Sequence, residues 1–168
     1  MSAILSPDLM LDSIYDLSPA FLKERGISLL LMDLDNTLAP YSENRPSVAL
    51  RNWLDALKKA GIEPFILSNN RGKRPQNFAA ALSLDYVGHA GKPSVKKLNA
   101  VLKKKGLSAK QAAIIGDQLY TDILCGNRAG VYAIAVRPID IKNPFRALRY
   151  ALELPFRRAY GRKMRKEV

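Results

Sequence analysis

Short apolar runs separated by amphipathic stretches dominate the pattern of hydrophobic and polar positions along the chain. Residues 27–33, 62–68 and 112–117 are largely apolar at successive positions, which is typical of strands covered on both faces of a parallel sheet. Shorter runs at 85–90 and 131–136 predict two further strands. The pattern therefore predicts a sheet of about five strands.

Helical patterns fill the intervals between these strands. Apolar residues from 50 to 57 fall at i, i+3, i+4 and i+7, so we expect an amphipathic helix with Trp53 in the core. Helix-permissive residues follow at 78–83, a lysine-rich helix ends at Gly106, and a short helix covers 121–130. Because strands and helices alternate, the sequence predicts an α/β fold, a three-layer sandwich around a parallel Rossmann-like sheet.

Terminal segments flank this predicted sheet. Ser18 and Pro19 are typical of the N-cap and first position of a helix that ends near Gly26. A chain of 168 residues suits one domain with one core. We therefore divide it into a helical lead-in at 1–26, a core at 27–137 and a basic amphipathic C-terminal segment at 138–168.

The C-terminal segment carries two apolar sets on either side of Pro155, which we expect to interrupt its helix. The first set is Phe145, Leu148 and Leu152, and the second is Phe156, Tyr160 and Met164. One hypothesis is an interfacial helix whose second set enters the acyl boundary while Lys and Arg meet headgroups. The alternative is that the first set packs on the domain and the remainder is a frayed basic tail.

The net charge of +12 is unevenly distributed. Residues 92–110 contain seven lysines and no acid, and residues 137–168 contain ten Lys or Arg against three acids. Two basic tracts on a nearly neutral body favour a polyanionic partner, either an anionic membrane surface or nucleic acid. For the first tract, lysines that merely keep the protein in solution are an equally good explanation.

Cysteine usage and hydropathy bear on the compartment. Cys125 has no partner for an intramolecular disulfide or a thiolate metal site, which favours a reducing cytosolic compartment. The N-terminus has no basic region before its apolar residues, and no apolar run approaches the roughly 20 residues of a membrane span. We expect a cytoplasmic protein, or one that is peripheral on the inner face of the membrane.

Polar and acidic residues follow the predicted strands directly. They are Asp33 and Asp35 after the first strand, Ser68 and Asn69 after the second, and Asp117 after the run at 112–116, with Lys92 just before the lysine-rich helix. In open parallel sheets, the carboxyl ends of the strands form the binding edge. Carboxylates gathered there repel one another unless a cation neutralises them, and a small set of hard oxygen ligands favours Mg²⁺.

Four motifs carry a resemblance to the haloacid dehalogenase-like (HAD) phosphotransferase superfamily: DLDNT at 33–37, the Ser of ILSNN, the Lys of GKPS, and GDQLYTD with Asp117 and Asp122. Nearly the whole chain resembles the YqeG-type family of uncapped subfamily III phosphatases, including its full GDQLYTDILCGNRAG. The resemblance implies a HAD phosphatase core with strand order 5-4-1-2-3. It also implies no cap domain, since only APYSENR separates DLDNTL from the next helix.

The resemblance further assigns chemical roles. Asp33 would attack phosphorus and form an aspartyl-phosphate, and Asp35 would protonate the leaving alcohol and then activate water. Mg²⁺ would be held by the Asp33 carboxylate, the Asp35 backbone carbonyl and Asp117. Phosphoryl oxygens would be received by Ser68, the Asn69 N–H and Lys92.

Supporting roles have simpler alternatives. Asp122 would orient Lys92 or a metal-bound water, although alone it would be interpreted as a helix N-cap. Thr37 would brace the loop, and Asn36 is interpreted as a turn residue. His89 is expected to be structural or solvent-facing, and no chemistry is assigned to Cys125.

The YqeG-type family has relatives that dephosphorylate phosphatidylglycerophosphate to phosphatidylglycerol. The resemblance therefore implies that this chain has the same lipid phosphate as its substrate and hydrolyses it at the membrane surface. One alternative is the same chemistry on soluble or protein phosphomonoesters. Another is a basic RNA- or ribosome-binding protein whose HAD site is regulatory. The uncapped site favours phosphate displayed on something large.

Overall fold

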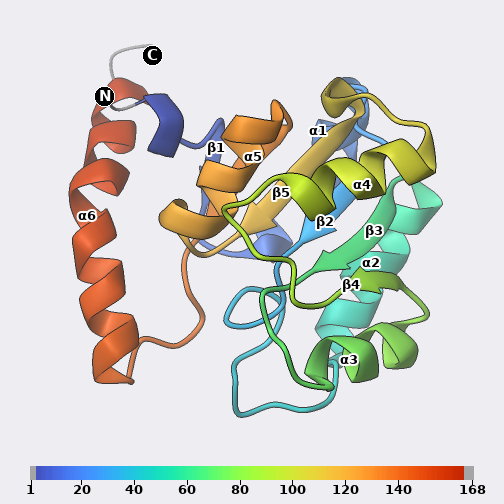
Figure 1. Cartoon of the computed structure of the whole chain (residues 1–168), viewed down its shortest axis with the longest axis horizontal. Coiled ribbons are helices and arrows are strands. Elements are labelled where there is room, and N and C mark those ends of the chain that lie inside the picture. Colours follow the sequence, from blue (N-terminus) through green and yellow to red (C-terminus); the bar gives the residue numbers. More distant parts are fainter. Residues whose placement is uncertain (1–2, 165–168) are drawn as a thin grey trace.

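Six parallel strands form one sheet in the computed structural model, which describes residues 3–164 (Figure 1). The order from edge to edge is β1-β6-β5-β2-β3-β4. The strands are β1 (Leu9–Leu11), β2 (Leu29–Met32), β3 (Glu63–Leu67), β4 (Asp85–Val87), β5 (Ala112–Gly116) and β6 (Tyr132–Val136). The α/β class and the predicted order of five strands are confirmed, because that order corresponds to β6-β5-β2-β3-β4.

Helices cover both faces of this sheet. They are α1 (Pro19–Glu24), α2 (Val48–Lys59), α3 (Arg74–Leu82), α4 (Lys96–Lys105), α5 (Leu124–Ala129) and α6 (Pro144–Met164). Helices α1, α2 and α3 pack with one hydrophobic cluster, whereas α4 and α5 pack with the other. The molecule is therefore a three-layer sandwich without a separate cap among the described residues.

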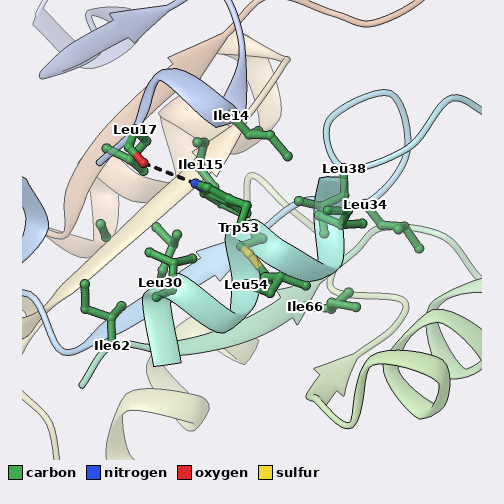
Figure 2. Close-up of a cluster of buried hydrophobic side chains, with 14 of the residues drawn as sticks. Ile14, Leu17, Leu30, Leu34, Leu38, Trp53, Leu54, Ile62, Ile66 and Ile115 are labelled. Atoms are coloured by element: carbon green, nitrogen blue, oxygen red, sulfur yellow. Dashed lines mark hydrogen bonds between the residues drawn. The ribbon is translucent and has the colours of Figure 1, made fainter. Parts of the chain in front are cut away.

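Strand β2 shows why the central strands are apolar at every position. Its four residues are fully buried, with Leu30 and Met32 in the cluster under α2 and Leu29 and Leu31 in the cluster under α4. Trp53 packs in the first cluster and donates its indole N–H to the carbonyl of Leu17 at 3.1 Å (Figure 2). The core position predicted for Trp53 is confirmed.

Strand β1 was not predicted by the hydrophobic pattern. It has only three residues, and none of them is fully buried. Its place at the sheet edge is set by pairing with β6, and Asp8 reinforces the pairing because its carboxylate accepts the N–H of Ala133 at 2.7 Å. A strand this short is determined by tertiary contacts more than by its own sequence pattern.

Several helix ends lie at capping residues or glycines that can be recognised in the sequence. The Ser18 hydroxyl caps α1 with Pro19 at its start, and Ser108 and Gln111 form a capping box on the turn before β5. Helix α4 ends at Gly106, which adopts the left-handed conformation at φ 67°. No helix within residues 3–164 is long and apolar enough to cross a membrane.

Helix α6 corrects the prediction that Pro155 interrupts the C-terminal helix. The helix runs unbroken from Pro144 to Met164, although Pro155 supplies no N–H for it. Glu153 and Arg157 are anchored to the domain on either side of the proline, and this anchoring holds the helical path. Tertiary contacts therefore override a local breaker.

The orientation of α6 also differs from both hypotheses for the C-terminal segment. One hypothesis placed the second apolar set at a membrane, and the other packed the first set on the domain. Phe156 of the second set packs toward the core, and the Tyr160 hydroxyl donates to the carbonyl of Asp8 at 3.3 Å. The first set, Phe145, Leu148 and Leu152, is exposed. The reason is that the anchors Glu153 and Arg157 lie on the helix face of Phe156 and Tyr160. The side chain of Met164 and residues 165–168 lie outside the described part of the chain.

Candidate active site

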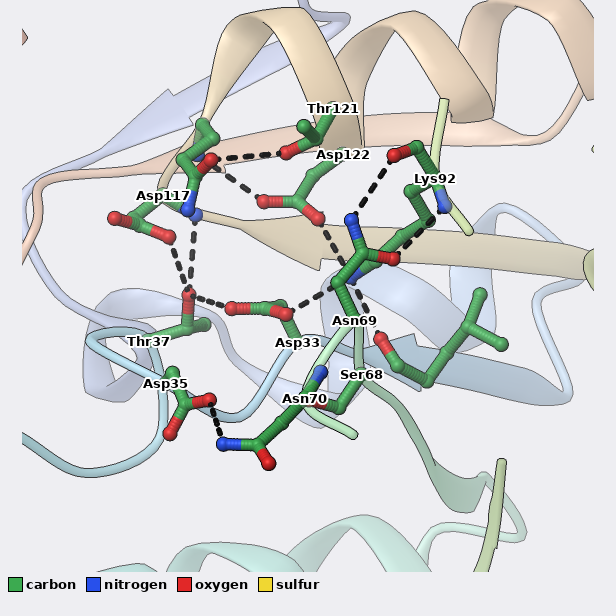
Figure 3. A network of polar contacts seen from close by, with 12 residues as sticks. Asp33, Asp35, Thr37, Ser68, Asn69, Asn70, Lys92, Asp117, Thr121 and Asp122 are labelled. Carbon is green, nitrogen blue, oxygen red and sulfur yellow. Dashed lines mark hydrogen bonds and ion pairs between the residues drawn. The ribbon is translucent and has the colours of Figure 1, made fainter. Parts of the chain in front are cut away.

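The carboxyl ends of β2, β3 and β5 bring the predicted residues together at one edge of the sheet (Figure 3). Asp33 directly follows β2, Ser68 follows β3 and Asp117 follows β5. Lys92 reaches the same point from the loop before α4, and Asp122 reaches it from the π-helical turn Leu119–Ile123. Parallel strands thus deliver residues far apart in sequence to one location.

Lys92 is the central cation of this group, and its side chain is almost fully buried. Its ammonium lies 2.8 Å from Asp33 Oδ1 and 2.7 Å from Asp122 Oδ1, and it donates to the carbonyl of Leu67 at 2.6 Å. An ammonium has three hydrogens, so these three acceptors occupy it fully. Contact between Lys92 and a phosphoryl oxygen would require it to exchange one of them.

Thr37 links the other two acids. Its Oγ1 lies 3.2 Å from Asp33 Oδ2 and 3.2 Å from Asp117 Oδ1, and it accepts the backbone N–H of Asp117 at 3.1 Å. Because the hydroxyl has one hydrogen, it cannot donate fully to both carboxylates. Thr37 therefore sets the spacing of Asp33 and Asp117 but can donate its hydrogen to only one of them at a time.

The carboxylate of Asp122 is held in place by a backbone N–H on the side away from Lys92. Its Oδ2 accepts the N–H of Gln118 at 3.1 Å, while its Oδ1 faces Lys92. Gly116 makes this approach possible, because a Cβ at that position would lie 2.3 Å from the Asp122 carboxyl group. A side chain at the first position of the GDQLYTD motif would therefore clash with Asp122, which explains why that position is a glycine.

Burial and mutual repulsion raise the pKa values of two acids in this group. Burial raises the pKa of Asp33 to about 6, with Lys92 opposing the shift and Asp122 adding to it. Burial, followed by the charge of Asp33, raises the pKa of Asp117 well above its usual range. Burial alone would lower the pKa of Lys92, but the carboxylates of Asp122 and Asp33 outweigh it and the pKa is raised.

The donor set fits a divalent cation. Asp33, Asp117 and Asp122 each offer a carboxylate oxygen, and these atoms all lie within 4.8 Å of one another. When ionised, three carboxylates beside the single ammonium of Lys92 leave two uncompensated negative charges. A hard divalent ion would balance them with the oxygen ligands that it prefers.

Asp35 belongs to a different environment, although it lies only two residues from Asp33. Its Oδ2 accepts from Asn70 Nδ2 at 2.8 Å and its Oδ1 accepts from Arg74 Nε at 2.7 Å. Arg74 also donates to the backbone carbonyls of Pro40 and Glu43. We call Asp35, Asn70 and Arg74 the outer half of the site, and Asp33, Thr37, Lys92, Asp117 and Asp122 the inner half.

Ser68 and Asn69 lie between the two halves. The Ser68 hydroxyl accepts the N–H of Asn70 at 3.1 Å, which leaves its own hydrogen for another acceptor. The Asn69 side chain exchanges two hydrogen bonds with the backbone of Lys92, at 2.9 and 2.8 Å. Among the described residues, the Asn69 N–H has no backbone or side-chain acceptor.

Several residues of the site were not singled out by the motifs. Asn70 and Arg74 bind Asp35, and Asn36, interpreted as a turn residue, exchanges hydrogen bonds with the backbone of Asp140 at 2.8 and 2.7 Å. The positive φ of Asn36, 67°, fits its position in a tight turn. Its buried amide therefore also ties the motif loop to the segment that leads into α6.

Glu153 and Arg157 of α6 were likewise missed. Glu153 Oε1 accepts the N–H of Leu119 at 2.9 Å, and Arg157 donates to the backbone carbonyls of Asp117 and Val136. The two side chains also form a buried ion pair at 3.0 Å. An acid and an arginine at i and i+4 were the available signal, which a tail rich in arginine obscures.

Other polar or hollow features lie away from this cluster. His89 is exposed, and its backbone N–H donates to the carbonyl of Asn70. Burial raises the pKa of the Cys125 thiol to about 11, so it stays protonated at neutral pH. A hollow of about 520 Å³ beside Lys58, Glu63 and Asp85 lies at the amino ends of the strands, opposite the acids.

Comparisons with known proteins agree with this geometry. A family model described as HAD-hydrolase-like matches residues 89–138. The chain is 34% identical over 139 residues to the probable phosphatase YqeG of Bacillus subtilis (strain 168), covering 83% of this chain and 81% of that protein. It is 31% identical over 130 residues to the chloroplastic phosphatidylglycerophosphate phosphatase 1 of Chlamydomonas reinhardtii, covering 70% of this chain and 47% of that protein.

Among solved structures, the 3-deoxy-D-manno-octulosonate 8-phosphate phosphatase of Yersinia pestis aligns with a TM-score of 0.53 at 20% identity, covering 68% of this chain and 66% of that chain. This likeness supports the fold. Together with the family match, the fold and the cluster of acids define a HAD-superfamily phosphatase. Within that superfamily, the chain belongs to the YqeG family.

Proposed function

We propose that this phosphatase is a Mg²⁺-dependent phosphomonoester hydrolase that works through an aspartyl-phosphate on Asp33 and acts on phosphatidylglycerophosphate at a membrane surface. The observation that carries the chemistry is the convergence of Asp33, Asp117 and Lys92 with Asp35 beside them. The lipid substrate is supported by the similarity to phosphatidylglycerophosphate phosphatase 1.

In the first chemical step, a carboxylate oxygen of Asp33 attacks phosphorus while the bond from phosphorus to the substrate alcohol breaks. Asp35 gives its proton to the departing alcohol oxygen. In the second step Asp35 takes a proton from water, whose oxygen attacks phosphorus and releases the Asp33 carboxylate together with inorganic phosphate. Asp35 returns to its protonated state, so atoms and protons balance over the cycle.

The phosphoryl oxygens would be held by donors of the chain itself. Within residues 3–164, neither the Ser68 hydroxyl nor the Asn69 N–H donates to a protein acceptor. Lys92 fixes Asp33 Oδ1, whereas Asp33 Oδ2 lies beside the Thr37 hydroxyl. Lys92 would reach the phosphoryl group only after releasing one of its present acceptors.

Asp33, Asp117 and the backbone carbonyl of Asp35 would hold the metal, with Asp122 occupied by Lys92. When bound, Mg²⁺ supplies the positive charge that offsets the clustered carboxylates and the phosphoryl oxygens. Calcium would be a poorer fit for a site with few protein ligands, because it takes 6–8 oxygens as a rule.

The openness of the site supports a substrate whose phosphate is displayed on something large. Residues 33–47, between β2 and α2, contain no inserted domain, and α3 is the only helix between β3 and β4 in the described chain. No cap would enclose a small metabolite. A headgroup phosphate at a membrane surface could be presented directly to such an edge.

The test is phosphate release from phosphatidylglycerophosphate in mixed micelles, measured beside a panel of soluble phosphomonoesters, with Mg²⁺ and with a chelator. We expect the lipid to be the preferred substrate, activity to require the metal, and Asp33→Asn to reduce hydrolysis to background. Preference for a soluble ester would overturn the lipid assignment. Equal rates for wild type and Asp33→Asn would overturn the chemistry.

A further inference from the structure

Helix α6 has an outward apolar face that nothing in the described structure covers. Phe145, Leu148 and Leu152 are 83%, 61% and 59% exposed, and their spacing of three and four residues places them in one row. We call this row the outer stripe. Ile139 and Ile141, in the segment before the helix, are exposed as well. Exposed apolar side chains gathered in one region mark interaction surfaces more often than single ones do.

The opposite face of the same helix is already committed to the domain. Phe156 packs against Tyr120 with ring centroids 6.0 Å apart, and the Glu153–Arg157 pair is buried against the strand ends. Figure 1 shows α6 along one flank of the molecule. The outer stripe is therefore a fixed external surface, and burying it against its own domain would require breaking these contacts.

Basic residues accompany the outer stripe. From Pro144 to Met164 the helix contains six Lys or Arg and one Glu. Arg146 and Arg149 alternate with the stripe residues along the helix, and Lys142 precedes it. Large apolar side chains flanked by cations are complementary to an anionic lipid surface, where the former enter the acyl boundary and the latter meet the phosphates.

Helix α4 shows that basic charge alone does not make such a surface. It also carries clustered lysines, but its apolar residues Leu98, Val101 and Leu102 are buried in the core. Lys105 is paired with Glu63 and Asp85. The lysine tract is thus an ordinary solvated helix face, whereas α6 combines exposed apolar groups with the half-buried Arg146 and Arg149 and the exposed Arg158. Of these, Arg146 also pairs with Asp140.

The outer stripe also lies beside the catalytic edge. Arg146 and Arg149 line a small cleft together with Asn36 and Asp117. A membrane bound along this side of α6 would therefore present headgroups next to the acid cluster. This geometry would allow the enzyme to act on a phosphate without withdrawing the lipid from the bilayer.

We propose that Phe145, Leu148 and Leu152 of α6 dock the protein on an anionic phospholipid surface and present the acid cluster to lipid headgroups. This deepens the proposed function and rests on it for the link between docking and substrate. Docking itself is independent of catalysis, so the two can be tested separately.

The test is flotation of the full chain with vesicles of phosphatidylcholine, with and without phosphatidylglycerol. The outer-stripe variant is Phe145→Gln, Leu148→Gln and Leu152→Gln, which removes exposed apolar groups without adding a helix breaker. The matched control, called the α4 variant, is Lys103→Gln, Lys104→Gln and Lys110→Gln, which removes charge from the lysine tract at 92–110. Hydrolysis of a soluble aryl phosphate and the melting temperature of each variant check that it is folded.

We expect wild type to float with anionic vesicles only, and less as salt is raised. The outer-stripe variant should lose at least about tenfold in vesicle affinity, and the α4 variant less than about threefold. Equal binding by the outer-stripe variant, or an equal loss in the α4 variant, would overturn the proposal. The proposal would also be overturned if the protein did not bind vesicles and the outer stripe were instead required for dimerisation or for retention on an RNA homopolymer.

Asp33→Asn separates the two proposals. It should float as wild type does, because the outer stripe is intact. Wild type that hydrolyses the lipid in micelles but does not float would refute the docking surface and leave the function standing. A protein that floats but hydrolyses nothing would refute the function and leave the docking surface standing.

Discussion

Two acids that lie two residues apart in the chain occupy very different environments in the site. In the inner half, Asp33 is fixed between Lys92 and Thr37, and every member of the group is buried. In the outer half, Asp35 is bound by Asn70 and Arg74, which come from the loop after β3 and the start of α3. Position in the motif therefore does not determine environment, because different elements supply the partners of the two acids.

This difference suits two different tasks. A nucleophile needs one fixed direction of attack, which a dense and buried network provides. A proton donor must exchange protons with an alcohol and then with water, which requires hydrogen-bond partners that can be released. Asp35 is about as buried as Asp33, but its partners Asn70 and Arg74 are only half-buried. Changes that disturb one half of the site should therefore affect one task more than the other.

Asp35→Asn removes the exchangeable proton while keeping the size of the side chain. We expect the rate of lipid hydrolysis to fall by about 10²–10⁴-fold, the usual contribution of general acid–base catalysis. A substrate with an aryl leaving group needs less protonation, so it should lose less. Equal losses for alkyl and aryl phosphates, measured as kcat, would contradict the role of Asp35 in protonating the leaving group.

Arg157→Met tests the support that α6 gives to the inner half. It leaves Glu153 buried without its ion-pair partner and removes donors to the carbonyls of Asp117 and Val136. We expect a loss of about 3–5 kcal/mol in the free energy of unfolding, as found when one partner of a buried pair is removed. Urea unfolding measures it.

The control for this change is the double variant Glu153→Gln with Arg157→Met. Because the unpaired charge is then absent, the double variant should lose no more stability than Arg157→Met alone. Strict additivity of the two single losses would show that Glu153 and Arg157 stabilise the domain independently.

Arg74→Met tests the outer half. The change takes away one of the two partners of Asp35 and two contacts to the loop at 40–43. A hydrogen bond to a charged group contributes about 1.5–3 kcal/mol to stability, so we expect the free energy of unfolding to fall by about that amount. We also expect kcat to fall by about tenfold, because Asp35 is no longer held in position. Arg74→Lys should restore part of the rate. Stability that falls while kcat stays unchanged would assign Arg74 a purely structural role.

Mg²⁺ should stabilise the protein more above neutrality than in mild acid. The folded-state pKa of Asp33, about 6 against an ordinary value of 3.8, means that the metal-free folded protein keeps a proton that the unfolded chain loses. The stability contributed by this group therefore falls as pH rises from 3.8 to about 6.

Metal competes with that proton, so saturating Mg²⁺ should raise the melting temperature by several degrees at about pH 7.5 and by much less at about pH 5. Thermal unfolding with and without a chelator measures this. An equal shift at both pH values would mean that the metal binds elsewhere. Asp117→Asn should abolish the shift.

The inner half could be predicted from the sequence because its members follow apolar strands whose order fixes their position. Asp33 and Asp117 each follow such a strand, and the motifs supplied Thr37, Lys92 and Asp122. The outer half could not be predicted completely. Asn70 and Arg74 reach Asp35 through the loop after β3, where no periodic pattern constrains the backbone.

The same contrast holds for the fold. The central strands and the capped helices could be predicted from the sequence, because their burial pattern and their local capping signals indicate the same elements. Strand β1 and the unbroken α6 were not, since both depend on contacts with distant residues: β1 on β6, and α6 on Leu119 and Asp117. Helix α6 shows this most clearly, because its sequence pattern gives two apolar sets and only the buried Glu153–Arg157 pair decides which one faces inward.

The most direct test of the central proposal is to find the phosphoryl group on the enzyme. Wild type would be mixed with phosphatidylglycerophosphate and Mg²⁺ in mixed micelles, quenched in acid during turnover, and its peptides mapped by mass spectrometry. We expect phosphate on the peptide that carries Asp33, and none in Asp33→Asn. Turnover in wild type without phosphate on that peptide, or continued hydrolysis by Asp33→Asn, would contradict the proposed mechanism.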